Sequence, residues 1–307
     1  MAELSRRALL GGIGGVAVIG GAAALLQTDV LPGRVRAWRQ VERVLPDGVP
    51  PSPEPGGPTA GTGSVSGAAS VERGAFFSVA RNGVRAGWVL ITPGGGAVRP
   101  GLPVVVALHG HGADETMLLG LRAPELLTAA IAAGVPPFAV ASVAGGNGYW
   151  HPRHDGTDSA ATVLDEFLPM LARRGLRTTS GLGLLGWSMG GYGALRLAGL
   201  LGPSRVAAVV ACSPALWRSP GESAPGAFDD AEDFRREDVF GARTAIARVP
   251  LRVDCGLGDP FLAAARAFVA GVTPRPEGGF QPGGHDGDYW RRRLPDQLAF
   301  LGRHLAT

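Results

Sequence analysis

Short apolar runs alternate with longer segments of helical periodicity over most of the chain. The strand-like runs are 103–108, 138–143, 181–185, 206–211 and 251–255. The helix-like segments are 159–174, 192–198, 260–270 and 288–305. Short apolar runs are typical of buried strands, and apolar positions three to four residues apart are typical of a helix that packs on one face. Strands separated by helices predict a mostly parallel sheet with helices on both faces.

An antiparallel hairpin is expected before this parallel part. Residues 74–80 and 87–91 both have the pattern of a strand, and Asn82-Gly83 between them is a strong turn signal. The predicted fold class is therefore α/β, with a mostly parallel central sheet that begins with an antiparallel N-terminal hairpin. In such sheets, functional residues gather at the carboxyl ends of the strands.

The first 26 residues have the layout of an export signal. The pair Arg6 and Arg7 is followed by a mildly apolar run to Leu26, as in a twin-arginine signal. The run is also close to the minimum length of a membrane span, ~17–20 residues, so a membrane anchor stays open as the alternative. Residues 27–70 are rich in Pro and Gly and are expected to form a linker. Residues 71–307 would then form one globular domain.

Composition excludes several kinds of chemistry. All 29 basic residues are arginine, which rules out a lysine Schiff base, pyridoxal-phosphate attachment and a phosphate-loop lysine. The net charge of +3 is dispersed along the chain, so we expect no nucleic-acid partner. Two cysteines, Cys212 and Cys255, are too few for a disulfide scaffold. Two buried thiols or a single bridge between them both stay open.

The segment from Gly186 to Gly191 (Gly-Trp-Ser-Met-Gly-Gly) is a G-x-S-x-G motif between a predicted strand and a predicted helix. A turn this tight needs small residues on both sides of the serine, and it holds the serine hydroxyl clear of the backbone. Ser188 is therefore the candidate nucleophile. The backbone N–H of Met189, at the start of the helix, is a candidate oxyanion donor.

A serine nucleophile needs a histidine base and an acid that orients it, in the chain order serine, acid, histidine. His285 lies in a glycine-rich turn before the last predicted helix, whereas His304 is almost at the C-terminus, so His285 is the predicted base. Asp254 and Asp259 are the candidate acids. We prefer Asp259 because it lies in the loop beyond its strand, although it could also cap the helix that follows.

The second oxyanion donor is expected in the loop after the strand 103–108. Its sequence, His109-Gly110-His111-Gly112, lets the backbone bend towards the serine, and we assign the donor to the His111 amide. Two histidines two residues apart with no third nearby make a weak metal site. The pair His151 and His154 is equally weak. We therefore expect no metal and no cofactor.

These motifs together resemble the esterase D and antigen 85 family, which includes S-formylglutathione hydrolases, feruloyl-type esterases and mycolyltransferases. The resemblance spans about residues 71–306 and implies an α/β-hydrolase fold. It also implies that the segment 145–150, with Arg153 beyond it, borders the substrate. The residues assigned to the substrate pocket are Trp150, Arg153, Trp187 and Trp217. The long insertion 213–248 is expected to be a pocket wall, a partial lid or a surface loop.

The predicted function is that of an exported serine esterase that hydrolyses carboxylic esters or thioesters of small molecules or lipids. An acyltransferase to a sugar or lipid alcohol is the alternative, but the residues around the serine differ from those of antigen 85, which favours hydrolysis. A non-catalytic binding protein on the same fold is disfavoured because the motifs of the nucleophile, base and acid are all present. The protein is expected to be secreted or associated with the cell envelope, with membrane or cell-wall contact through its N-terminus.

Overall fold

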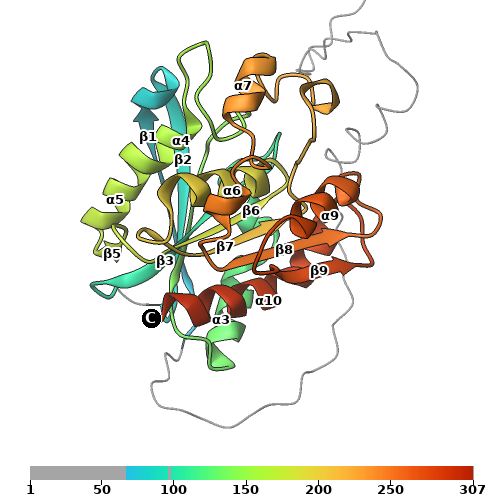
Figure 1. The fold of residues 1–307 in the computed structure, drawn as a ribbon. Helices are drawn as coiled ribbons and strands as arrows, with labels where there is room; N and C mark the ends of the chain where they lie inside the picture. Colours follow the sequence, from blue (N-terminus) through green and yellow to red (C-terminus); the bar gives the residue numbers. More distant parts are fainter. Residues whose placement is uncertain (1–66, 96–97, 307) are drawn as a thin grey trace, which may run out of the picture. The chain divides into compact units, whose positions relative to one another are not determined.

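A computed structural model of the protein describes residues 67–95 and 98–306. Within this part of the chain, one sheet contains all the strands (Figure 1). The strands are β1 (Ser70–Ser78), β2 (Val84–Thr92), β3 (Leu102–Leu108), β4 (Ala139–Val143), β5 (Leu176–Arg177), β6 (Leu182–Trp187), β7 (Val206–Cys212), β8 (Leu251–Gly256) and β9 (Glu277–Gln281). Their spatial order is β1-β2-β4-β3-β6-β7-β8-β9, with β5 pairing beside β3.

The sheet is mostly parallel, as predicted. Strand β2 is antiparallel to both of its neighbours, β1 and β4, and every other pairing is parallel. The predicted hairpin is β1–β2, paired from Ser70 with Thr92 to Ser78 with Val84. Asn82 (φ 52°) and Gly83 (φ 78°) make the left-handed turn between them, a conformation that these two residue types tolerate.

Helices cover both faces of the sheet. They are α2 (Met117–Gly120), α3 (Ala123–Ala132), α4 (Ser159–Ala161), α5 (Leu168–Arg173), α6 (Met189–Leu201), α7 (Ala231–Arg236), α8 (Arg243–Ile246), α9 (Leu262–Ala270) and α10 (Gly287–Leu305). One apolar core lies between the sheet and α3 and α10, which run along the bottom of Figure 1. The other core lies between the opposite face and α5, α6 and α8. This two-faced architecture is the α/β-hydrolase fold.

The predicted strands are present, and the predicted helices differ from the observed ones in detail. The segment predicted as 159–174 is helical from Ser159 to Arg173, and its middle, Thr162–Phe167, is a π-helix. The helix expected from Pro260 begins at Leu262, because the Asp259 carboxylate accepts the Phe261 N–H and holds a turn there. Helix α3 was not predicted from the sequence. Strand β9 was not predicted either, because it contains Gly278 and Gly279 and glycine is a poor strand former.

The predicted signal or anchor (1–26) and almost all of the predicted linker (27–70) lie outside the described residues. Strand β1 begins at Ser70, next to the predicted boundary at residue 71. None of the helices within 67–95 and 98–306 combines the length and hydropathy needed to cross a membrane.

The two cysteines are free thiols in the structure. Cys212 on β7 lies opposite Asp254 on β8. Cys255 follows Asp254 on β8, so its side chain points to the face of the sheet opposite to that of Asp254 and Cys212. Both thiols are buried, and this alternation is the physical reason that the bridge left open by the sequence does not form.

Candidate active site

Ser188 occupies a strained turn between β6 and α6. Its backbone has φ 56° and ψ −119°, a conformation that costs energy for a residue with a Cβ and is typical of functional sites. A Cβ at Gly186 would lie 2.0 Å from the carbonyl oxygen of Gly190, and one at Gly190 would lie 1.9 Å from that of Leu108. The turn therefore requires glycine on both sides of the serine.

The structure brings Ser188, His285 and Asp259 together from three separate loops. Nε2 of His285 lies 2.9 Å from Oγ of Ser188, and Nδ1 lies 2.9 Å from Oδ2 of Asp259. All three side chains are buried. Burial by itself would raise the pKa of Asp259, but hydrogen bonds from His285, the Phe261 amide and Ser213 outweigh burial and lower it. Asp259 is thus held as a carboxylate that can orient the imidazole.

Asp254, the other candidate acid, faces different partners. Its carboxylate accepts from Nε and Nη2 of Arg252 at 2.8 and 3.0 Å, and from Nε2 of Gln297 at 3.0 Å. It is fully buried within β8. Ser213, which no sequence motif marks, lies beside the candidate acid Asp259. It has φ 47°, accepts from the Trp290 indole at 3.0 Å and hydrogen-bonds to Asp259.

The two predicted oxyanion donors belong to the two segments that meet at Ser188, the start of α6 and the loop after β3. Met189 is the first residue of α6, and the first amides of a helix have no partner within the helix. The loop after β3 lies close to the serine: a Cβ at Gly110 would lie 3.5 Å from Cβ of Ser188. The next residue is His111, whose half-buried imidazole has its pKa lowered by burial.

His109, which the sequence analysis considered only as a metal ligand, fixes the backbone of this loop. Its Nε2 accepts the Gly145 N–H at 2.9 Å, so the ring proton must be on Nδ1, which lies 2.8 Å from the Gly110 carbonyl oxygen. Burial lowers the pKa of His109 to about 4, and the ring is therefore neutral. The Gly110 carbonyl and the His111 N–H belong to one trans peptide and point in opposite directions. By holding the carbonyl, His109 directs the His111 amide the other way.

Asn147 supports the same loop from the segment after β4. Its Oδ1 accepts the Gly112 N–H at 2.8 Å. No local motif marks Asn147 in the sequence, because its partner lies 35 positions earlier in the chain.

A continuous row of aromatic rings borders the site. From His285 it passes to Phe261 (ring centroids 5.2 Å apart), to Trp217 (5.6 Å), to Tyr149 (5.6 Å) and to His111 (5.9 Å). The row therefore connects the predicted base to the loop after β3. Trp217, a predicted pocket residue, lies within this row and is 9% exposed.

Trp150 and Trp187 were also predicted to line the substrate pocket, but the structure places both in the core, at 0% and 1% exposed. Trp150 fills the space left by glycines: a Cβ at Gly145 or Gly193 would lie 2.4 or 2.5 Å from its ring. Trp187 packs in the core between the sheet and α10, because the alternation of side chains along β6 points it to the α10 face of the sheet. We assign both tryptophans to packing.

Arg153 anchors the insertion 213–248 to the rest of the domain. Its Nε and Nη2 donate to Oδ1 of Asp229 at 3.1 and 2.7 Å, and its Nη1 donates to the carbonyl oxygens of Gly226 and Ala227, each at 3.0 Å. His151 stacks on Phe228 of the same insertion. These contacts fit a fixed wall, one of the three alternatives that the sequence left open.

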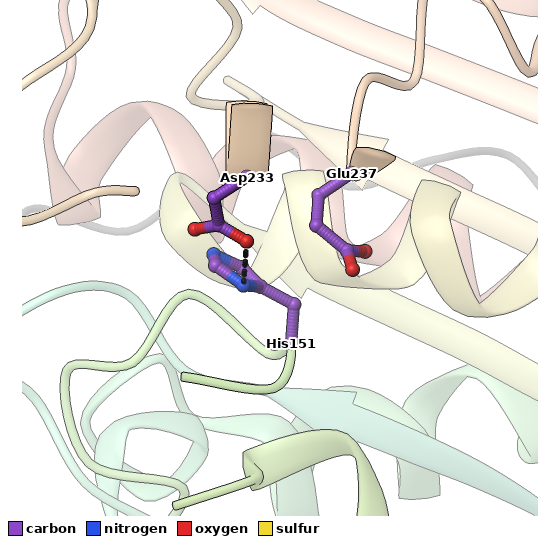
Figure 2. A group of neighbouring side chains, drawn as sticks. All are labelled: His151, Asp233 and Glu237. Carbon is purple, nitrogen blue, oxygen red and sulfur yellow. Dashed lines mark ion pairs between the residues drawn. The ribbon is translucent and has the colours of Figure 1, made fainter. Parts of the chain in front are cut away.

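His151, Asp233 and Glu237 have ligand atoms close enough together to hold a metal ion (Figure 2). These atoms are already engaged. Nδ1 and Nε2 of His151 lie 2.9 and 3.0 Å from the carbonyl oxygens of Pro152 and Ala227. Arg236 donates to Asp233 at 3.0 Å, and Arg196 donates to Glu237. The group is therefore an ion-pair network that joins α7 to α6 and to the loop after β4.

Comparison with known proteins identifies the family. Residues 92–301 match the Esterase family ("Putative esterase"). A ferulic acid esterase has a similar structure (TM-score 0.66, 20% identity, covering 77% of this chain and 99% of that one). The S-formylglutathione hydrolase FrmB of Staphylococcus aureus is also similar (TM-score 0.63, 16% identity, covering 76% of this chain and 99% of that one). So is MPT51 (FbpC1) of Mycobacterium tuberculosis (TM-score 0.57, 16% identity, covering 73% of this chain and 94% of that one).

A search of curated protein sequences finds no match. The structural neighbours share too little sequence to show more than the fold, which they share with this chain over nearly their full length. The family match covers more than half of the chain and extends from the end of β2 into α10. On this evidence the chain belongs to the esterase family, as an α/β hydrolase of the carboxylesterase type.

Proposed function

We propose that the protein is a serine esterase that cleaves carboxylic esters or thioesters through an acyl-enzyme on Ser188. The observation that carries the proposal is the pair of 2.9 Å contacts that join Ser188 to His285 and His285 to Asp259. His285 takes the proton of the serine hydroxyl as its oxygen attacks the carbonyl carbon. The Met189 and His111 amides stabilise the oxyanion that forms.

Collapse of the tetrahedral intermediate releases the alcohol or thiol, which takes the proton from His285. Water then attacks the acyl-enzyme while His285 accepts a proton from the water. His285 returns this proton to Oγ of Ser188 as the bond to the acyl carbon breaks and the carboxylic acid leaves. Transfer to an alcohol acceptor would use the same residues, with the acceptor in place of water. The aromatic row beside His285 supports contact with an apolar acyl group.

The nucleophile is tested by Ser188→Ala. Because only the covalent step is lost, we expect ester turnover to fall by a factor on the order of 10³ or more. A fluorophosphonate probe should label the wild type at Ser188. Ser78→Ala, which also removes a buried hydroxyl, should retain activity and labelling. Labelling of another serine, or near-normal turnover of Ser188→Ala, would refute the assignment.

The acid is tested by a matched pair of isosteric variants. Asp259→Asn should lower kcat by a factor on the order of 10³, with almost no further loss when it is combined with Ser188→Ala. Asp254→Asn should act mainly on stability, because Asp254 is paired with Arg252 inside the sheet. A folded Asp254→Asn protein with the larger loss of kcat would show that the acid is misassigned.

We also propose that the esterase is exported by the twin-arginine route, acts in the cell envelope or outside the cell, and contacts the membrane or cell wall through its N-terminus. The sequence pattern over 1–26 supports this proposal. Replacing Arg6 and Arg7 with alanine should leave active enzyme in the cytoplasm, as measured by cell fractionation. Normal export of that variant would contradict the twin-arginine proposal.

Product analysis with and without an added polyol would separate hydrolysis from acyl transfer.

A further inference from the structure

A cavity of about 330 Å³ lies beside the segment 145–148. It is in the size range of small-ligand pockets, ~300–1,000 Å³. Its wall is lined mainly by polar residues: Val84 is the only purely aliphatic side chain, and the other residues are glycines, hydroxyl-bearing residues, Asn147 and charged residues. A polar wall of this kind suits a charged or hydrogen-bonding part of a ligand.

The cavity is mechanically linked to the oxyanion loop. Asn147, which lines the cavity, accepts the Gly112 N–H at 2.8 Å, and Gly145, also in the wall, donates to His109 at 2.9 Å. The loop that contains these two partners also contacts Ser188 through Gly110. The cavity therefore adjoins the loop that lies against Ser188.

Most charges in the wall already have partners. The Asp229 carboxylate is bound by the Arg153 guanidinium and by the His154 N–H at 2.7 Å. Asp155 accepts from the N–H and hydroxyl of Thr157 at 2.9 and 2.7 Å. Asp155 is also exposed, so water screens its charge strongly.

Arg81 is the exception. It donates from Nη1 to the Ala144 carbonyl oxygen at 2.7 Å, and it takes part in none of the ion pairs found within 67–95 and 98–306. Burial lowers the pKa of Arg81 more than the attraction of Glu166 raises it. A guanidinium has five N–H donors, so Arg81 keeps donors for a ligand. A Cβ at Gly146 would lie 2.6 Å from its Nη2, so glycine there is what lets the guanidinium lie against the loop.

We propose that this cavity binds a carboxylate of the ester substrate through Arg81. The inference rests on the proposed function and narrows the substrate class to anionic esters. Attraction to the half-buried Arg81 outweighs repulsion from Asp155, because charges interact more strongly away from bulk water. The carboxylate could belong to the acyl part or to the leaving group, and the two sources are separable by experiment.

The test uses four thioesters whose released thiol is read with the same colorimetric reagent. One acid is S-acetyl-3-mercaptopropionate, with the carboxylate on the leaving group. The other is the mono-ethylthioester of succinic acid, with the carboxylate on the acyl group. The controls are the primary amides of both. We expect the wild type to prefer one acid over its amide by roughly ten-fold in kcat/KM, mainly through KM, as for a charge-assisted hydrogen bond.

Arg81→Ala should remove that preference and change turnover of the amides less than about two-fold, which also shows that the variant is folded. Arg81→Lys, which keeps the charge but loses the planar fork, should keep part of the preference. Arg85→Ala removes an exposed charge from the same hairpin and should keep the full preference for the acid over its amide. The proposal would be overturned if the wild type preferred neither acid over its amide. It would also be overturned if Arg81→Ala lowered kcat/KM equally for the acids and the amides. Turnover by Ser188→Ala would refute the serine mechanism without removing an Arg81-dependent preference, so the two failures are distinguishable.

Discussion

At the scale of single residues, several side chains that touch no reacting atom hold those that do. His109 fixes the Gly110–His111 peptide, Asn147 holds the next amide, and Ser213 bonds to the acid Asp259. His109 and Ser213 are buried, where an unmade hydrogen bond is costly, whereas the bond of Asn147 is exposed. Removing one should therefore impair the geometry of the site as well as the stability of the fold.

The titration of His109 gives a prediction with a definite sign. Its pKa falls from an unfolded value of about 6.5 to about 4 in the fold, so the unfolded chain binds more protons between these values. The stabilisation is complete above pH 6.5 and is lost as the pH falls towards 4. A difference of about 2.5 pH units, at about 1.4 kcal/mol each, amounts to about 3 kcal/mol.

His109→Gln should therefore lose less stability than the wild type when the pH is lowered from 6.5 to 4, measured as the free energy of unfolding in urea. The matched control is Met117→Leu, which removes the sulfur acceptor of the Gly110 N–H in the same loop. Because it has no titrating group, its curve should stay parallel to that of the wild type. Parallel curves for His109→Gln and the wild type would contradict the prediction.

At the scale of secondary-structure elements, the decisive unit is the passage from β6 through Ser188 to α6. The strand, the strained residue and the helix start must meet the loop after β3 at backbone distance, and Gly190 provides the space. In the same helix, Gly199 faces side chains rather than backbone, those of Ile246 and Ala242. A side chain is therefore excluded by backbone at Gly190, whereas at Gly199 it would meet only side-chain atoms.

Gly190→Ala should destabilise the protein by about 3 kcal/mol and abolish turnover, because its Cβ would meet the Leu108 carbonyl oxygen at 1.9 Å. Gly199→Ala should stay within about 1 kcal/mol of the wild type, since its Cβ would lie 3.1 Å from Cγ1 of Ile246 and alanine favours the helix. Thermal unfolding and ester turnover of both variants provide the check. Equal effects of the two substitutions would show that the close approach at Gly190 is not what the turn requires.

At the scale of the whole molecule, the sheet begins with a strand that the family match does not include. Residues 70–78 pair along their full length with β2, and the Ala69 N–H donates to Thr128 of α3. Strand β1 therefore covers an otherwise open edge of the sheet beside buried β2. The domain should depend on β1 but not on the residues before it.

A chain that begins at Gly67 should fold and hydrolyse esters with a kcat/KM within about two-fold of the full-length protein. A chain that begins at Asn82 should aggregate or unfold, because it leaves the edge of β2 unpaired. Circular dichroism, size-exclusion chromatography and turnover of the two chains provide the measurements. An inactive chain from Gly67 would show that the segment 1–66 contributes to the domain.

The sequence alone determined the fold class, the hairpin and the strand–serine–helix turn, because these follow from local patterns: apolar periodicity, Asn82-Gly83 and the glycines around Ser188. It also narrowed the base and acid to a few residues through chain order. Only the tertiary structure decided that Asp259, rather than Asp254, meets His285. That choice depends on where two loops end in space, and no local pattern specifies it.

The tertiary structure also decided the roles of the aromatic residues and of His109. Trp150 and Trp217 are the same residue type, and both were expected to line the pocket, yet one fills the space beside two glycines in the core and the other joins the aromatic row. The positioning role of His109 could not be read from a local motif, because its partner, Gly145, lies 36 positions away in the chain. Burial and long-range hydrogen bonds depend on how distant segments pack, whereas a motif records only its immediate neighbours.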